Sequence, residues 1–260
     1  MGELERALRE RRDRGGHSFA PYVTGGFPGV DAGLLRALQD AGADALEVGI
    51  PFSDPVMDGG VVQEASRLSL EAGTRPSDVL ATIREAGLSI PVAVMTYVNP
   101  VFRRGLETFL DDAREAGVAG VIVPDLPVDE AADLESAAAA RGIDVVLLAA
   151  PGTIPTRLAT IAAHARGFVY CVATYGVTGA RDELGSTGAS LVAALRPLTD
   201  LPLLLGVGIG SPEQAAEACL SADGVIVGSA LMALMVQGDR DGTVALAAAF
   251  RAAIPALDAR

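Results

Sequence analysis

Short apolar runs recur along the chain, and most of them follow a helix-like segment that ends in a small residue and glycine. Two examples are "EAGVAGVIVPDLP" and "ARGIDVVLLAAP". A glycine at such a boundary favours a left-handed cap that ends the helix, after which a buried strand begins. The glycines that we expect to act in this way are Gly42, Gly87, Gly117, Gly142 and Gly167. With an opening strand near residues 19–24 and "TDLPLLLGVGIG", where Pro202 replaces the glycine, the pattern predicts eight strands.

The segments between the strands suit helices, for example residues 30–41, 105–116, 129–141 and 211–220. Nearly continuous apolar strands that alternate with helices are typical of a parallel sheet covered on its outside. Eight such units predict an α/β fold: a single (βα)8 TIM barrel over residues 1–260, with an extra helix at its N-terminus. A doubly wound open sheet is the alternative architecture for the same pattern.

One unit is much longer than the others, and its surplus begins with "LEVGIPFSDPVMDGG". Strand alternation places Glu47 on the same face as the small residues Ala45 and Gly49, and bulky residues on the other face: Leu46, Val48 and Ile50. We expect the bulky residues to face the helices, so that Glu47 points into the barrel. Burial there raises the pKa of a carboxylate toward the range of a general acid and base. A structural carboxylate held by a donor from a neighbouring strand is the alternative.

Asp58 lies in the loop beyond this strand. Acidic residues before glycines are ordinary in loops, so Asp58 alone is weak evidence for a site. Its position past the carboxyl end of a barrel strand favours a role in function, because the active sites of such barrels are built there.

Glycine-rich turns follow the last two predicted strands, in "GVGIGSPEQA" and "VIVGSALM". Ser211 is expected to cap a helix with Pro212 at its first position, and Gln214 completes a capping-box pattern. Each turn alone is consistent with ordinary strand-to-helix chemistry. Together they predict a phosphate site, which backbone amides and the Ser229 hydroxyl would form because neither segment contains Lys or Arg.

The sixth predicted strand is followed by the polar, glycine-rich segment "TYGVTGARDELGSTGAS". A loop of this length in a compact barrel is expected to be a lid or to be disordered. Tyr170 lies within the strand itself, and the sequence leaves open whether it faces the barrel interior or fills the core around it.

The charge of the chain argues against two classes of partner. With 20 basic and 33 acidic residues, the formal net charge of −13 opposes binding to nucleic acid or to an anionic membrane. No apolar run is long enough to span a bilayer, and the start, "MGELERALRERRDRGG", is charged where a secretion signal is apolar. We therefore expect a cytoplasmic protein. Cys171 and Cys219 are expected to be buried thiols, and His17 and His164 are too far apart in sequence to suggest a zinc centre.

With these residues assembled, the sequence resembles the tryptophan synthase alpha subunit over nearly its whole length. The matching segments include "YVTGGFPG", "AGADALEVGIPFSDPVMDGGVVQ", "MTYVNPVF", "GVIVPDLPVDE", "FVYCVATYGVTGAR", "GVGIGSPEQA" and "DGVIVGSA". The resemblance implies a (βα)8 barrel that cleaves indole-3-glycerol phosphate, the phosphorylated indole substrate, to indole and glyceraldehyde 3-phosphate. It implies no metal and no organic cofactor, and a tryptophan synthase beta subunit as partner in an α2β2 complex.

The resemblance also assigns residues. The catalytic glutamate falls on Glu47 and the catalytic aspartate on Asp58. Substrate-binding positions fall on Tyr22, Tyr97, Tyr170, Thr178, Gly179, Gly208, Gly228 and Ser229. Alternatives are a stand-alone lyase that releases free indole and a catalytically silent regulatory barrel. The sequence departs from the family at Met57 and Gly60, which flank Asp58, and at Val207.

Overall fold

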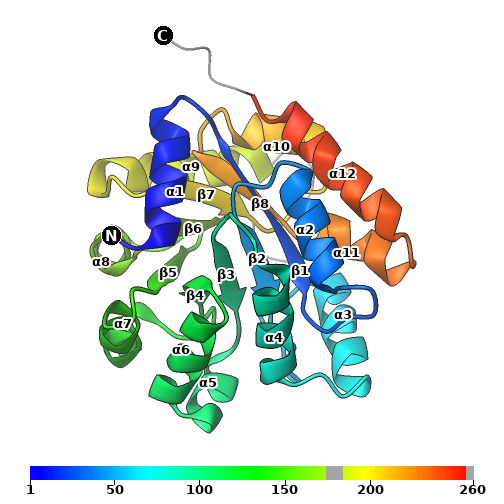
Figure 1. The fold of residues 1–260 in the computed structure, drawn as a ribbon. Helices are drawn as coiled ribbons and strands as arrows, with labels where there is room; N and C mark the ends of the chain where they lie inside the picture. Colours follow the sequence, from blue (N-terminus) through cyan, green and yellow to red (C-terminus); the bar gives the residue numbers. More distant parts are fainter. Residues whose placement is uncertain (174–183, 256–260) are drawn as a thin grey trace.

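Eight parallel strands close into a barrel in the computed structural model, which describes residues 1–173 and 184–255. The strands follow their sequence order, and β1 pairs with both β2 and β8 (Figure 1). This closure confirms the predicted barrel and excludes the open doubly wound sheet. The strands are β1 (Ser18–Thr24), β2 (Leu46–Gly49), β3 (Val92–Met95), β4 (Val118–Ile122), β5 (Asp144–Ala149), β6 (Val169–Val172), β7 (Leu203–Gly206) and β8 (Gly224–Val227).

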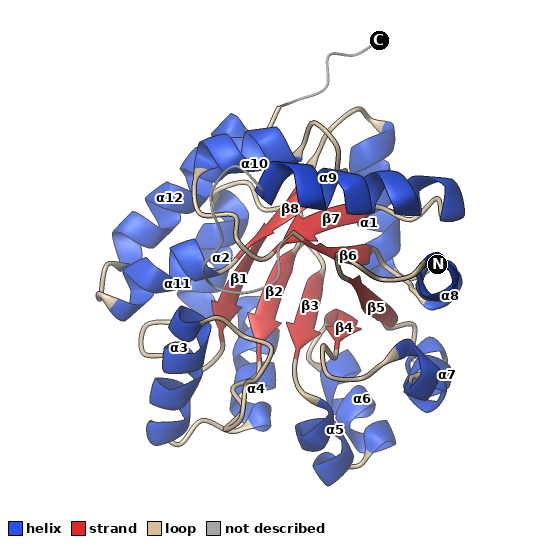
Figure 2. Ribbon diagram, turned by 180° about the vertical axis from the view of Figure 1, so that it is seen from behind, coloured by secondary structure: helices blue, strands red, loops and turns tan. Residues whose placement is uncertain are grey.

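Helices surround the strands on the outside of the barrel (Figure 2). In the described residues they are α1 (Glu3–Asp13), α2 (Ala32–Asp40), α3 (Gly60–Glu71), α4 (Pro76–Ala86), α5 (Val98–Arg104), α6 (Leu106–Glu115), α7 (Ala132–Ala139), α8 (Pro155–His164), α9 (Leu184–Leu195), α10 (Pro212–Ala218), α11 (Ser229–Val236) and α12 (Arg240–Ala253), with 3-10 turns at Val128–Glu130 and Arg196–Leu198. The long second unit contains two helices, α3 and α4, between β2 and β3.

The glycines predicted to stop helices all have left-handed backbone angles. Their φ values lie between 55° and 97°, a range that side chains with a Cβ rarely adopt: Gly42, Gly87, Gly117, Gly142 and Gly167. The prediction of glycine caps before buried strands is therefore confirmed for Gly42, Gly87, Gly117 and Gly142. It is wrong for Gly167, because α8 ends at His164 with an extended C-cap residue, Ala165, and Gly167 lies in the turn beyond it.

Two groups of buried side chains lie on opposite faces of the sheet. The larger group contains the outward side chains of the strands and the helix residues packed on them, including Leu46, Val48 and Ile50. The smaller group fills the barrel itself and includes Ala45, Val146 and Leu204. Strand alternation thus places bulky residues under the helices and leaves small residues beside Glu47.

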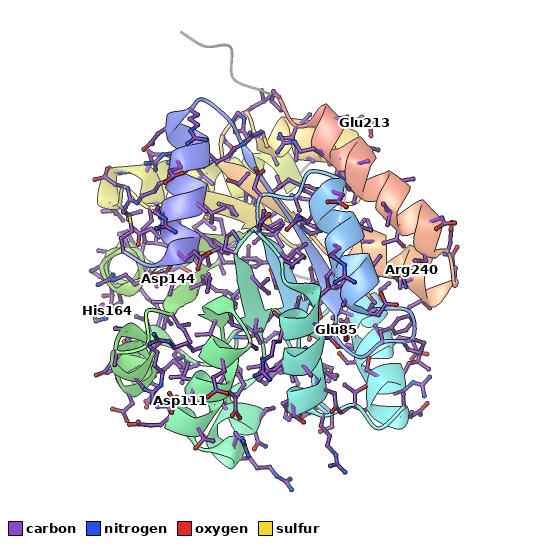
Figure 3. The ribbon with its side chains drawn as sticks, in the orientation of Figure 1. Glu85, Asp111, Asp144, His164, Glu213 and Arg240 are labelled. Carbon is purple, nitrogen blue, oxygen red and sulfur yellow. The ribbon has the colours of Figure 1, made fainter. Side chains whose placement is uncertain are left out.

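The extra N-terminal helix, α1, covers the end of the barrel where the strands begin. Leu4 and Leu8 of α1 are fully buried among the interior side chains. The carboxylate of Asp144, the first residue of β5, accepts hydrogen bonds from the backbone N–H groups of Gly2 (3.2 Å) and Glu5 (3.0 Å). Figure 3 shows Asp144 beside the start of α1. The helix is capped by a residue from a distant strand, which fixes it across the barrel.

Candidate active site

Glu47 is the second residue of the short strand β2, in register with the last part of β1, and its side chain lies inside the barrel, as alternation predicts. It is only 3% exposed, and it pairs in register with Tyr22 of β1 and Ala93 of β3. Among the residues that the structure describes, its Oε2 atom has no hydrogen-bond partner. A buried carboxylate oxygen without a partner is costly, and a buried carboxyl group with a perturbed pKa inside a barrel is a candidate for a functional site.

The surroundings of Glu47 favour its protonated form. Burial, and to a smaller extent the nearby carboxylate of Asp58, raise the pKa of Glu47 to about 8. At neutral pH most Glu47 side chains therefore hold a proton that they can donate. Such a pKa suits a group that acts as an acid in one step and as a base in the next.

Asp58 lies in the loop after β2, where Tyr97 holds it. The Tyr97 hydroxyl donates a 3.0 Å hydrogen bond to Oδ2 of Asp58 and accepts one, also 3.0 Å, from the backbone N–H of Met57. Tyr97 immediately precedes α5, and its ring stacks on Phe52 with the ring centroids 5.1 Å apart. One tyrosine from the end of β3 therefore ties down both the carboxylate and the backbone of the β2 loop.

Asp58 keeps more of its charge than Glu47 does. Burial raises the pKa of Asp58 to about 6, and the hydrogen bond from Tyr97 limits that rise. The two carboxyl groups thus differ in protonation near neutral pH: Glu47 is mostly protonated and Asp58 is mostly ionised. Two titratable groups whose pKa values differ in this way can act as a proton donor and as an anion in the same site.

Tyr22 and Tyr170 form buried walls of the site. The sequence left the orientation of Tyr170 open, and the structure places it among the interior side chains of the barrel. The hydroxyl of Tyr170 lies against Gly206 and that of Tyr22 against Gly49, so closely that a Cβ at either glycine would overlap it. Burial raises the pKa of both tyrosines well above the usual value, so both hydroxyls remain protonated.

Thr24 is a site residue that the sequence reasoning missed. Its hydroxyl is fully buried, and it lies 3.2 Å from the hydroxyl of Tyr22. Residues 22 and 24 of one strand share a face, so alternation alone indicated that Thr24 points into the barrel beside Tyr22.

One glycine of the predicted phosphate turns has a left-handed backbone conformation. Gly208 has a φ of 94°, and the preceding Val207 is the one non-glycine residue of the described chain with a positive φ, at 67°. A β-branched residue rarely adopts this conformation, which marks the turn as strained. Gly208 and Ser229 are exposed, and Gly228 precedes α11 as its N-cap residue.

The capping pattern at α10 is confirmed only in part. The Ser211 side chain accepts from the N–H of Gln214 at 3.3 Å, as predicted. The Gln214 side chain, however, accepts from the N–H of Gly210 (2.7 Å) rather than from Ser211. The Gly210 amide is therefore used within the turn, which leaves Gly208, Gly228 and Ser229 as the described candidates for phosphate.

Thr178 and Gly179 lie outside the described residues. Within the described chain, no group of three or more His, Cys, Asp and Glu side chains could hold a metal ion. The two cysteines, Cys171 and Cys219, are buried free thiols, as predicted.

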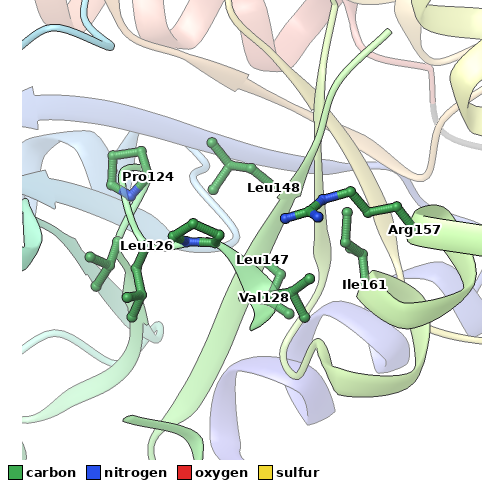
Figure 4. A pocket seen from close by; sticks show the side chains of 9 residues that line it. Pro124, Leu126, Val128, Leu147, Leu148, Arg157 and Ile161 are labelled. Atoms are coloured by element: carbon green, nitrogen blue, oxygen red, sulfur yellow. The ribbon is translucent and has the colours of Figure 1, made fainter. Parts of the chain in front are cut away.

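A separate small cavity of about 100 Å3 lies between the ends of β4 and β5 and helix α8 (Figure 4). Most of the residues that line it have apolar side chains, and the guanidinium of Arg157 that reaches over it pairs with Asp129 at 2.8 Å. It contains neither Glu47 nor Asp58, so it is not part of the carboxylate site.

The sequence matches the tryptophan synthase alpha chain family over residues 8–253. The chain belongs to this family. It is 45% identical over 239 residues to the tryptophan synthase alpha chain of Carboxydothermus hydrogenoformans, covering 90% of each chain. It is 44% identical to the alpha chain of Streptomyces avermitilis, over 91% of this chain and 87% of that one. A solved structure of Mycobacterium tuberculosis tryptophan synthase superposes with a TM-score of 0.89 at 37% identity, covering 97% and 98% of the two chains.

Membership of the tryptophan synthase alpha chain family confirms the resemblance drawn from the motifs. In the described part of the chain, no helix is both long and apolar enough to cross a membrane.

Proposed function

We propose that this chain is the alpha subunit of a tryptophan synthase and cleaves indole-3-glycerol phosphate to indole and glyceraldehyde 3-phosphate. The observation that carries the proposal is a pair of carboxyl groups, buried Glu47 and half-buried Asp58, with different pKa values, about 8 for Glu47 and about 6 for Asp58. The reaction needs one group that gives and takes a proton, and one that stays negative.

Glu47 is the proton shuttle in this proposal. Its carboxyl group delivers a proton to C3 of the indole ring, which makes C3 tetrahedral and leaves positive charge on the ring nitrogen. The resulting carboxylate takes the proton of the hydroxyl on the adjacent side-chain carbon. The bond between C3 and that carbon then breaks, its electron pair returns to the ring, and the carbon becomes the aldehyde. Glu47 ends the cycle protonated, as it began.

Asp58 stabilises the charge that develops on the indole nitrogen. An ionised carboxylate that accepts from the ring N–H acts where positive charge appears, and it acts strongly in a site from which water is excluded. The hydrogen bond from Tyr97 supports this role, because it orients Asp58 and keeps its pKa lower than burial alone would make it.

The substrate phosphate fits the glycine turns after β7 and β8. The amides of Gly208 and Gly228, the Ser229 hydroxyl and the N-terminus of α11 are the described groups that we assign to it, and Thr178 and Gly179 complete the proposed set. Tyr22, Tyr97 and Tyr170 enclose the remainder of the substrate.

Exposed apolar side chains in the β2 loop and in α5 support the assignment as a subunit. Val56 and Met57, next to Asp58, are 69% and 56% exposed, and Phe102 of α5 is 59% exposed. Large apolar side chains exposed around one rim are typical of a protein interface. We assign this rim to the beta subunit of an α2β2 complex.

The test is an assay for indole released from indole-3-glycerol phosphate by the isolated chain, with and without a tryptophan synthase beta subunit. We expect measurable cleavage by the chain alone and strong activation by the partner. Full activity without a partner would support a stand-alone lyase instead. Absence of cleavage under both conditions would support a silent regulatory barrel.

A further inference from the structure

Two buried hydroxyl groups inside the barrel take no part in the proton steps above. The hydroxyls of Tyr22 and Thr24 lie 3.2 Å apart, and either can be the donor of the hydrogen bond between them. Tyr22 is 5% exposed and Thr24 is fully buried. They occupy alternate positions on β1, so both point into the barrel toward the site.

The side chain of Tyr22 reaches from the strand that carries Glu47 to the proposed phosphate turn after β8. At one end, its hydroxyl lies against Gly49, which follows Glu47 on the same inward face. At the other end, its Cδ1 atom is 3.1 Å from where a Cβ on Gly228 would lie. Gly228 belongs to the proposed phosphate turn. The Tyr22 hydroxyl therefore lies at the carboxylate end of the site, beside the strand that carries Glu47. The part of the ring nearest the backbone lies beside the proposed phosphate turn.

One hydroxyl hydrogen of the Tyr22–Thr24 pair is not used in the hydrogen bond between the two groups. Each hydroxyl carries one hydrogen, so two hydrogens are available, and the bond between the two groups uses one of them. Among the described residues, no acceptor takes the other hydrogen. Both groups stay protonated, because burial and the charges of Asp58 and Glu47 oppose ionisation of Tyr22. The pair thus presents an unused donor within a buried site, which is costly unless a ligand accepts it.

We propose that the Tyr22–Thr24 hydroxyl pair binds the middle hydroxyl of the substrate's glycerol chain and makes the enzyme select substrates that carry it. This inference rests on the proposed function. The middle hydroxyl lies between the carbon that is cleaved beside Glu47 and the carbon that bears the phosphate. The Tyr22 ring spans the same two regions with its hydroxyl toward the carboxylate end, so the hydroxyl pair meets the carbon that follows the cleaved one, and this carbon bears the middle hydroxyl. A substrate that lacks this hydroxyl leaves the buried donor unpaired, and such sites discriminate strongly against the deoxy compound.

The experiment compares indole-3-glycerol phosphate with its analogue that lacks only the middle hydroxyl. Both are assayed for indole release with the full chain and its beta subunit. We expect the unaltered protein to prefer the natural substrate by at least about tenfold in kcat/KM, as loss of a buried hydrogen bond implies. Tyr22→Phe keeps the ring, so its kcat/KM for the natural substrate should fall by about fivefold to tenfold. Its kcat/KM for the analogue should stay within about twofold of the unaltered value.

Thr24→Val is the second variant, because it removes only the partner hydroxyl at nearly constant shape. We expect a smaller fall that is again confined to the natural substrate, and non-additive effects in the double variant because the two groups act as one unit. Thermal unfolding of each variant establishes that it is folded.

Equal loss of activity toward both substrates would show that Tyr22 only shapes the pocket, and would overturn the inference. Unchanged preference in both variants would overturn it as well. The proposed function fails separately, if the unaltered protein releases no indole from the natural substrate. In that case the inference about Tyr22 and Thr24 fails too.

Discussion

Two buried carboxyl groups stand at opposite ends of this barrel, and they differ in one respect. Asp144 lies where the strands begin and is 4% exposed, while Glu47 lies near the ends of the strands and is 3% exposed. Burial raises the pKa of both. Asp144, however, accepts from two backbone N–H groups of the α1 segment, whereas Oε2 of Glu47 has no partner among the described residues.

The comparison separates a structural carboxylate from a candidate catalytic one. The N–H groups at the start of α1 offset the cost of burying Asp144, and the bonds fix the helix over the barrel. No comparable donor from residues 1–173 or 184–255 meets Oε2 of Glu47, so this part of the protein retains an unfavourable group. The two carboxyl groups are equally buried, but only that of Asp144 is compensated by hydrogen bonds. The uncompensated burial of Glu47 therefore indicates a position where stability is lowered for function.

The largest expected difference between the two carboxylates is in catalysis. Glu47→Gln should lower kcat by about a thousandfold, because the amide cannot shuttle the proton. Asp144→Ala is the matched control and should leave kcat within about twofold, since it changes the opposite end of the barrel. The measurement is indole release at saturating substrate. A Glu47→Gln enzyme that kept more than about a tenth of the activity would contradict the assignment.

The second difference is in stability at high pH. The folded-state pKa of Glu47, about 8, lies above its ordinary value of 4.5, so the folded protein holds a proton that the unfolded chain releases. The folded state therefore loses stability relative to the unfolded state as pH rises from the lower value through the upper one. Glutamine does not titrate, so Glu47→Gln should raise the free energy of unfolding at about pH 9 by a few kcal/mol (~2–4).

Urea unfolding at about pH 5 and about pH 9 measures this effect, and the gain should shrink at the lower pH. An equal gain at both values would mean that the glutamine improves packing and that the titration of Glu47 is not the cause.

The third expected effect is on the stability of the end of the barrel that α1 covers. Asp144→Ala removes both acceptors and leaves the buried N–H of Glu5 without a partner, so the free energy of unfolding should fall by about 1–2 kcal/mol. Urea unfolding near neutral pH measures the change. An unaltered midpoint would show that α1 is held by the packing of Leu4 and Leu8 alone.

The smallest expected effect comes from Tyr97, which joins Asp58 to the fold. Tyr97→Phe removes the hydrogen bond that lowers the pKa of Asp58, now about 6, so that pKa should rise. Because the proposed role of Asp58 is that of an anion, kcat/KM should rise with pH through this pKa, and the acidic limb of the profile should move to higher pH. We also expect a loss of severalfold, about tenfold at most, at neutral pH. If the acidic limb of the kcat/KM profile did not move, Tyr97 would have no influence on the ionisation of Asp58.

The sequence by itself determined the barrel and the face on which Glu47 lies. Helix ends at glycines and the two-residue alternation of strands are local properties, so the repeat and the inward side of β2 are encoded in neighbouring residues. The motifs around Glu47 and Asp58 and in the glycine turns also identified the family without coordinates.

Only the tertiary structure decided which distant groups meet. Tyr97 reaches Asp58 across 39 positions and Asp144 caps α1 across as many as 142, and no local pattern encodes such pairs. The inward orientation of Tyr170 and the bond from Gly210 to Gln214 were likewise settled by the folded chain. Local sequence sets periodicity and direction, whereas contact between remote side chains depends on how the barrel closes and on the register of its strands.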